Sequence, residues 1–254
     1  MILRRVIAHF RKQEWTAIAI DFVIVVLGVF VGLQVANWNA ARSNERAYQD
    51  ALRRLAEENR AMLERAASSR ATISGMLVDA QRAIAALRNC EAGPEAEAII
   101  NKGLNSIRSG RAVGVSTLAI DQLVSDDRLL DRQDENARAS LRSYHSYLHG
   151  VADTSFRILT DNDLDIVDRH PAVGFSGLVA PSETFNKADV RRAEIAVPPE
   201  AACKDPTFVK LFYDWERKHN FQLNLIGELE EIISQRAVEL RLPSPAGLEK
   251  DAAP

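Results

Sequence analysis

The longest apolar stretch of the chain runs from Trp15 to Trp38. Its one charged residue is Asp21, near the start, and Gln34 is the strongly polar residue among the apolar positions that follow. A helix of about 20 apolar residues spans the roughly 30 Å hydrocarbon core of a bilayer, and tryptophan favours both membrane interfaces. The pattern therefore predicts one transmembrane helix over this stretch.

A cleaved signal peptide is the alternative interpretation of the apolar stretch. Signal peptides have an apolar region of about 7–15 residues, which ends in small residues at the cleavage site. The apolar region here is longer and leads into the bulky, polar sequence Asn37-Trp38-Asn39. We therefore expect the helix to be retained.

Beyond the apolar stretch, the same helix is predicted to continue to Asn89, just before the Gly93-Pro94 pair. Neither proline nor glycine occurs between Asn39 and Ser74. Hydrophobic or small residues recur at alternating spacings of four and three, the a/d pattern of heptads. This stripe comprises Tyr48, Leu52, Leu55, Asn59, Met62, Ala66, Ser69, Ile73, Met76, Ala80, Ala83 and Leu87. Because some of its members are small or polar, the core of a helical bundle explains the stripe at least as well as a coiled coil does.

The residues after the Gly93-Pro94 pair show no run with the two-residue period of a strand. The proline-rich segment 170–205 is predicted to be a long connection, with room for a short helix around 186–194. Asp205 followed by Pro206 is a strong start signal for the last helix, which ends near 242. Further helices are predicted over 95–109, over 117–130 with Ser116 or Thr117 as the cap, and over 134–161. The expected fold class is all-α, an antiparallel helical bundle.

The predicted organisation has four parts, namely a cytoplasmic tail 1–14, a transmembrane helix 15–38, a bundle 39–242 and a disordered tail 243–254. The first tail has a net charge of +3, so the net charge of −3 for the whole chain leaves −6 for the remainder. An acidic bundle lacks the basic surface that nucleic-acid binding requires, so we expect no nucleic-acid partner. The first tail is predicted either as an amphipathic helix on the membrane surface or as an unstructured basic flank.

The positive-inside rule alone does not give the orientation, because basic residues lie on both sides of the span in equal number. Two other arguments favour one direction. Long domains cross the membrane largely regardless of their charge, and the two cysteines suit an oxidising compartment. We therefore expect a cytoplasmic amino terminus and an extracytoplasmic bundle, which in a bacterium means the periplasm.

Small residues mark one face of the predicted span. Gly28 and Gly32 form a GxxxG pair that Ala36 continues, and Asp21 lies seven residues before Gly28 and hence on the same face. Small residues let membrane helices approach closely, and a carboxylate in a membrane rarely faces lipid. Asp21, Gly28 and Gly32 are therefore the predicted contact of a self-associating span. In the alternative, Asp21 lies near the headgroups and the glycines are incidental.

The two cysteines, Cys90 and Cys203, lack the spacing of a CxxC redox pair or of a zinc site. The first helix rises from the membrane, the segments 95–130 lead back, and the helix after Asp134 rises again. The last helix then starts at the membrane-distal end, just after Cys203. We therefore expect a disulfide between the two cysteines at that end, with two unpaired buried thiols as the alternative.

Other candidate sites lack part of the pattern that their chemistry needs. His145 and His149 have the spacing of metal ligands on a helix, but Ser146 replaces the glutamate of HExxH and no third ligand is evident. The aspartates of 161–165 resemble a calcium loop without its glycine and glutamate. The glycines of 174–177 are one residue too close for a nucleophile elbow. We therefore expect two surface histidines, no catalytic residues, no cofactor and no metal site.

Two stretches of the chain contain sequence motifs that can be compared with those of known families. The first, IVVLGVFVGLQVANWNAARSNER, ends the span in a Gln-x-x-Asn-Trp-Asn motif, and the second is TLAIDQLVSDDRLLDRQDENARASLRSYHSYL. Together they resemble an uncharacterised family of bacterial single-span membrane proteins. Asp21 is similar to an acidic position of that family, whereas Asp127 stands where the family tends to have glycine. The resemblance implies a single-pass protein of the bacterial inner membrane whose span leads into a long helix, and it implies no activity.

Two function classes remain. In the first, the protein is not an enzyme but a structural or protein-interaction module of the envelope. Its partners are the lipid bilayer, a second copy through the span, and an envelope protein. In the second, the bundle senses a ligand in the periplasm. Since the tail before the span is only 14 residues long, such a sensor would work with a separate membrane partner.

Overall fold

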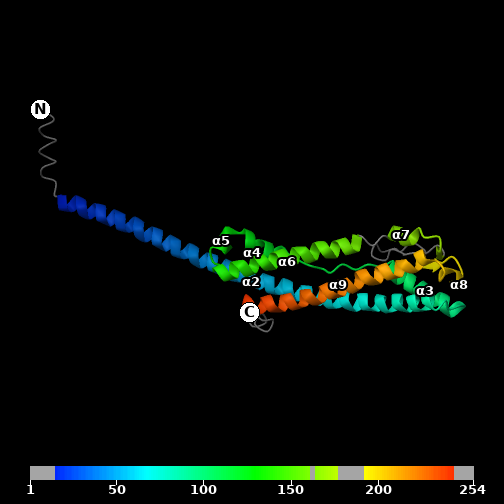
Figure 1. Cartoon of the computed structure of the whole chain (residues 1–254). Coiled ribbons are helices and arrows are strands. Elements are labelled where there is room, and N and C mark those ends of the chain that lie inside the picture. Colours follow the sequence, from blue (N-terminus) through cyan, green and yellow to red (C-terminus); the bar gives the residue numbers. More distant parts are fainter. Residues whose placement is uncertain (1–14, 161–163, 177–191, 243–254) are drawn as a thin grey trace, which may run out of the picture.

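The structure is a computed structural model that describes residues 15–160, 164–176 and 192–242 (Figure 1). The predicted tails 1–14 and 243–254 lie outside the described residues, as does most of the helix suggested for 186–194. Within the described residues the chain is almost entirely helical, which confirms the all-α class, with one small exception described below.

One helix, α2 (Trp15–Arg88), extends through the whole molecule. It runs without a break for 74 residues, which at about 1.5 Å per residue corresponds to roughly 110 Å. Its first part projects away from all other elements (Figure 1). After its end, Cys90 and Gly93 have positive φ angles of 46° and 90°, outside the right-handed helical region. The prediction of one continuous helix that ends near Asn89 is confirmed.

The projecting part of α2 carries the predicted apolar stretch, and its side chains are exposed from Ile20 onward. From Ile20 to Val35, each large apolar residue exposes between 47% (Val26) and 68% (Phe22) of its surface. Among the described residues, α2 is the one helix that is long and apolar enough to cross a membrane. A retained span and a signal sequence both meet this criterion.

The chain then returns along α2. α3 (Pro94–Ile107) lies against it, and Lys102 Nζ is 2.9 Å from a carboxylate oxygen of Asp79. A Cβ atom on Gly103 would lie only 2.4 Å from the Cβ atom of Ala83. Glycine at this position therefore allows the two helix backbones to approach closely.

An extended segment leads from α3 to two short helices, α4 (Leu118–Ser125) and α5 (Asp127–Leu130). The prediction of a single helix over 117–130 is wrong in this detail, because Asp126 has an extended backbone and its side chain caps α5. Thr117 occupies the predicted N-cap position of α4, but its side chain makes no cap hydrogen bond.

The next helix, α6 (Glu135–Thr160), runs in the same direction as α2. Just before its start, Arg132 lies 4.0 Å from Glu45. Further along, the Tyr144 hydroxyl donates a hydrogen bond of 2.7 Å to Asn59 Oδ1. Tyr144 and Asn59 are both buried, so this hydrogen bond joins α6 to α2 inside the core.

The last long helix, α9 (Pro206–Glu239), runs antiparallel to α2. The Asp205 carboxylate caps it by accepting hydrogen bonds from two backbone N–H groups, which confirms the predicted start. The polar contacts between the two helices are Gln81 with Glu216 and Arg70 with Glu230. Two further short helices, α7 (Leu164–Asp168) and α8 (Pro199–Ala202), precede α9 at the end of the molecule far from the apolar stretch (Figure 1).

The heptad stripe of α2 is the centre of the core. Of its twelve positions, Tyr48 and Met76 are partly exposed and the other members are buried. The stripe side of α2 packs against α3, α4, α5 and α9 of the same chain. The apolar side chains of the stripe are therefore buried by helices of the same chain, as the bundle-core interpretation requires.

The described residues also contain a small antiparallel sheet. β1 (Val173–Ser176) pairs with β2 (Arg192–Ile195), with Val173 opposite Ile195 and Ser176 opposite Arg192. The expectation that the chain has no strand is wrong, and so is the suggested helix where it overlaps β2. With four residues each, the strands are too short for a two-residue period to be visible against the proline-rich background.

Cys90 and Cys203 form a disulfide with their Cα atoms 5.3 Å apart. Cys90 lies just after α2 and Cys203 just after α8, at the end of the molecule far from the apolar stretch. The predicted pairing of the two cysteines is confirmed.

We predict that the disulfide is a large contribution to the stability of the described fold. It closes a loop of 113 residues, and the entropy lost by the unfolded chain corresponds to about 4–5 kcal/mol before any strain is subtracted. Replacing both cysteines, Cys90→Ser with Cys203→Ser, should lower the free energy of unfolding by up to this amount, measured by denaturant titration of the full chain in detergent.

A reducing agent should destabilise the wild-type protein to the same extent and leave the double variant unchanged. Equal stability of the two proteins under oxidising conditions would show that the bond contributes nothing.

Candidate functional site

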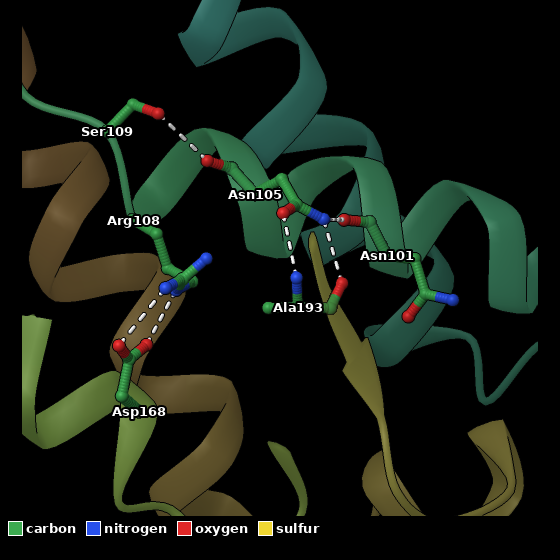
Figure 2. A network of polar contacts seen from close by, with 6 residues as sticks. All are labelled: Asn101, Asn105, Arg108, Ser109, Asp168 and Ala193. Atoms are coloured by element: carbon green, nitrogen blue, oxygen red, sulfur yellow. Dashed lines mark hydrogen bonds and ion pairs between the residues drawn. The ribbon is translucent and has the colours of Figure 1, made fainter. Parts of the chain in front are cut away.

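A polar network holds β2 against α3 (Figure 2). The Asn105 side chain donates a hydrogen bond to the Ala193 carbonyl (2.8 Å) and accepts one from the Ala193 N–H (2.9 Å). One helical turn earlier, Asn101 Oδ1 accepts a hydrogen bond of 2.8 Å from the Ile195 N–H. The two asparagines thus bond to the β2 backbone as a neighbouring strand would.

The end of α3 is joined to α7 by an ion pair (Figure 2). Arg108 Nε lies 2.6 Å from Asp168 Oδ1, and a terminal nitrogen of the same guanidinium lies 3.1 Å from Oδ2. The Arg108 guanidinium also lies 5.0 Å from the centre of the Phe175 ring on β1. The Arg108 side chain is only 12% exposed, so this two-point pair is better shielded from water than an ordinary surface ion pair.

A surface pocket of about 950 Å³ lies beside this network. Its lining includes side chains of both charges, and α2, α3 and β2 contribute them. The polar lining residues are Asp79, Asn101, Lys102, Asn105, Ser106, Arg108, Ser109, Arg192 and Glu194. Several of these groups already bond within the chain, as the Lys102–Asp79 and Arg108–Asp168 pairs show. The pocket has the size of a small-molecule site, but its lining shows no arrangement of nucleophile, base and oxyanion donors.

A second cluster lies between α4 and α6. Asp121 Oδ1 is 3.0 Å from His145 Nε2 and 2.8 Å from His149 Nε2. The Thr117 hydroxyl donates a hydrogen bond of 2.9 Å to the other carboxylate oxygen, Oδ2. The expectation that no third ligand-type group lies near the two histidines is therefore wrong.

The environment of Asp121 favours its ionised form. Partial burial acts to raise its pKa, but the hydrogen bonds from His149 and Thr117 and the nearby imidazoles outweigh that effect and hold the pKa below its ordinary value. The three side chains remain partly accessible to solvent, with exposed fractions of 41% for Asp121, 34% for His145 and 49% for His149.

The sequence indicated the two histidines of this cluster but not Asp121. The spacing of His145 and His149 indicates that they share a helix face. The position of Asp121 opposite them depends on how α4 packs against α6, and no local pattern encodes that packing.

The predicted association residues of the span lie on the exposed part of α2. Asp21, Gly28 and Gly32 are exposed, and a Cβ atom added to either glycine would meet nothing within 4 Å. Among the described residues, nothing therefore packs against this face.

Of the remaining sequence candidates, the structure describes only a part. Ser176 lies on β1, and its hydroxyl donates a hydrogen bond of 3.4 Å to the Arg192 carbonyl. Residues 161–163, which open the calcium-like pattern, and Gly177 lie outside the described residues.

Comparison of the chain with protein-family models, with curated proteins and with solved structures gave no match. The resemblance to a family of single-span bacterial membrane proteins therefore stays a prediction.

We predict that Asn105 protects the outer edge of β2. Asn105→Ala removes both hydrogen bonds to Ala193, each worth about 0.5–1.5 kcal/mol, so the Ala193 amide should exchange its hydrogen roughly tenfold faster or more. The measurement is hydrogen–deuterium exchange on overlapping peptides of the full chain. Asn101→Ala is the matched variant, and it should accelerate the Ile195 amide instead. Unchanged exchange at Ala193 in the Asn105 variant would contradict the assignment.

Proposed function

We propose that the chain is a membrane-anchored interaction module of the bacterial envelope. The apolar part of α2 spans the inner membrane, the amino-terminal tail is cytoplasmic, and the helices beyond Trp38 form an antiparallel bundle in the periplasm. The bundle presents its surface to a protein partner. No catalytic step is part of the proposal.

The observation that carries the proposal is the uncovered apolar part of α2. None of its most apolar 18-residue window is buried in the described chain, and an apolar surface of this size is not stable in water. At its end, the Arg42 guanidinium lies 5.7 Å from the centre of the Trp38 ring. An exposed tryptophan beside a basic residue suits the interface between lipid tails and headgroups.

Two features support placing the bundle outside the cytoplasm. Disulfides persist in oxidising compartments, and the Cys90–Cys203 bond joins residues that are far apart in the sequence. The basic tail before the span suits the cytoplasmic face, where anionic lipids attract it.

The span is also part of the proposed interaction. Asp21, Gly28 and Gly32 form an open face that a second copy of the helix can approach closely. On this proposal, two or more chains associate in the membrane, and each carries its own bundle.

We predict that replacing both glycines, Gly28→Ile with Gly32→Ile, weakens association of the full chain in a membrane two-hybrid assay by severalfold, because the larger side chains hold the helices apart. The matched control is Val26→Ile with Phe30→Ile, which changes two residues on the opposite helix face and should leave the signal intact. If the glycine variant associates as strongly as the wild type, this face is not the contact.

A ligand-sensing bundle that works with a separate membrane partner is the second candidate function. The polar pocket between α3 and β2 favours it, because its volume suits a small molecule. Mass spectrometry of the cross-linked, purified full chain separates the two candidates. A reproducible protein partner supports the interaction module, and a small molecule retained at one copy per chain supports the sensor.

A further inference from the structure

The Asp121, His145 and His149 cluster combines side chains that bind transition metals, and they come from two different elements. Asp121 lies on α4, and the two histidines lie one turn apart on α6. One ligand-type atom of each residue lies within 4.8 Å of those of the other two. The two imidazole rings tilt relative to each other at a centroid distance of 4.4 Å.

The distances are close to those of a metal site. In a tetrahedral zinc site with bonds of about 2.0–2.1 Å, neighbouring ligand atoms are about 3.3 Å apart. The distances from Asp121 Oδ1 to the two Nε2 atoms, 3.0 and 2.8 Å, need to lengthen by only a few tenths of an ångström. Small rotations of partly exposed side chains can supply that change.

Thr117 contributes a feature that metal sites share. Carboxylate ligands are held in place by hydrogen bonds from a second layer of residues. The Thr117 hydroxyl donates its hydrogen bond to Asp121 Oδ2, which leaves Oδ1 directed at both imidazoles. The Thr117 hydroxyl therefore holds the carboxylate in this orientation and does not cap its helix.

We propose that Asp121, His145 and His149 bind one divalent transition metal ion of the Zn²⁺ type. The three side chains supply two imidazole nitrogens and one carboxylate oxygen, which leaves at least one coordination position for water. Each neutral imidazole then carries its proton on Nδ1, while Nε2 binds the metal. Calcium and magnesium do not suit this site, because they prefer sets of oxygen ligands.

Metal binding at this position would join two elements of the bundle. The backbone N–H of Ala119 on α4 donates hydrogen bonds of 3.1 and 3.2 Å to the two Glu58 carboxylate oxygens on α2, and Tyr144 on α6 bonds to the adjacent Asn59. The cluster therefore lies at the level of Glu58, about 30 Å along α2 from Trp38. A metal ion would fasten α4 to α6 there and stabilise the folded chain by mass action.

A metal-free clamp is the competing explanation, with both histidines donating hydrogen bonds to Asp121. Binding measurements on the full chain in detergent, purified through a histidine-free tag and treated with a chelator, distinguish the two. We expect one Zn²⁺ per chain by calorimetry, displacement of bound Co²⁺ with loss of its visible absorption, and a higher melting temperature with Zn²⁺.

Asp121→Asn, His145→Gln and His149→Gln should each weaken Zn²⁺ binding about tenfold or more and abolish the Zn²⁺-dependent rise in melting temperature. His170→Gln is the matched control, since His170 contacts Thr207 and Phe208 at the start of α9 and not the cluster, so the variant should change neither readout. Circular dichroism of the metal-free variants checks that each one is folded.

No Zn²⁺ binding by the wild-type chain would overturn the proposal and leave the metal-free clamp. Undiminished binding by a folded His145→Gln and His149→Gln double variant would also overturn it, because the metal would then lie elsewhere.

Discussion

Four other helices of the chain, α3, α4, α5 and α9, pack against one buried stripe of α2, and this shared contact organises the fold. From Ile20 to Val35 the apolar residues of α2 are distributed all around the helix and are exposed. From Leu52 to Leu87 the buried apolar residues lie on the stripe and at the adjoining positions Leu77, Ile84 and Ala86, whereas Val78 is exposed. The helices α3, α4, α5 and α9 pack against this part of α2. The same continuous helix therefore has two surfaces, one suited to lipid on every side and one suited to a protein core. The boundary between them marks where the bundle begins.

The far end of the bundle is fastened by contacts between residues that are distant in the sequence. The Cys90–Cys203 disulfide ties the end of α2 to the start of α9, and Asn105 on α3 bonds to the backbone of β2. The end nearer the apolar stretch is held by smaller polar contacts, such as the Tyr144–Asn59 hydrogen bond. Covalent closure at one end and polar contacts along the helices thus join elements that are distant in the sequence.

The long helices were predictable from the sequence because their signals come from residues that are close together in the chain. The continuous α2 follows from the absence of proline throughout it and of glycine between Asn39 and Ser74. The start of α9 follows from Asp205 and Pro206. The disulfide was predicted in another way. The expected directions of the successive helices place both cysteines at the same end of the molecule. The strands β1 and β2 were not predictable, since each has four residues and β2 is held by asparagines about 90 residues earlier in the chain. Asp121 was missed for the same reason, because its neighbours are on another helix.

We propose that α2 anchors an extracytoplasmic bundle in the membrane. The most direct measurement fuses alkaline phosphatase, or in parallel a fluorescent protein that matures only in the cytoplasm, to the carboxy terminus of the full chain in bacterial cells. We expect active phosphatase and no fluorescence, from a fusion that has the size of the uncleaved chain and stays with the membrane. An inactive phosphatase beside a fluorescent reporter would place the bundle in the cytoplasm, and a shortened, soluble fusion would show that the apolar stretch is a cleaved signal.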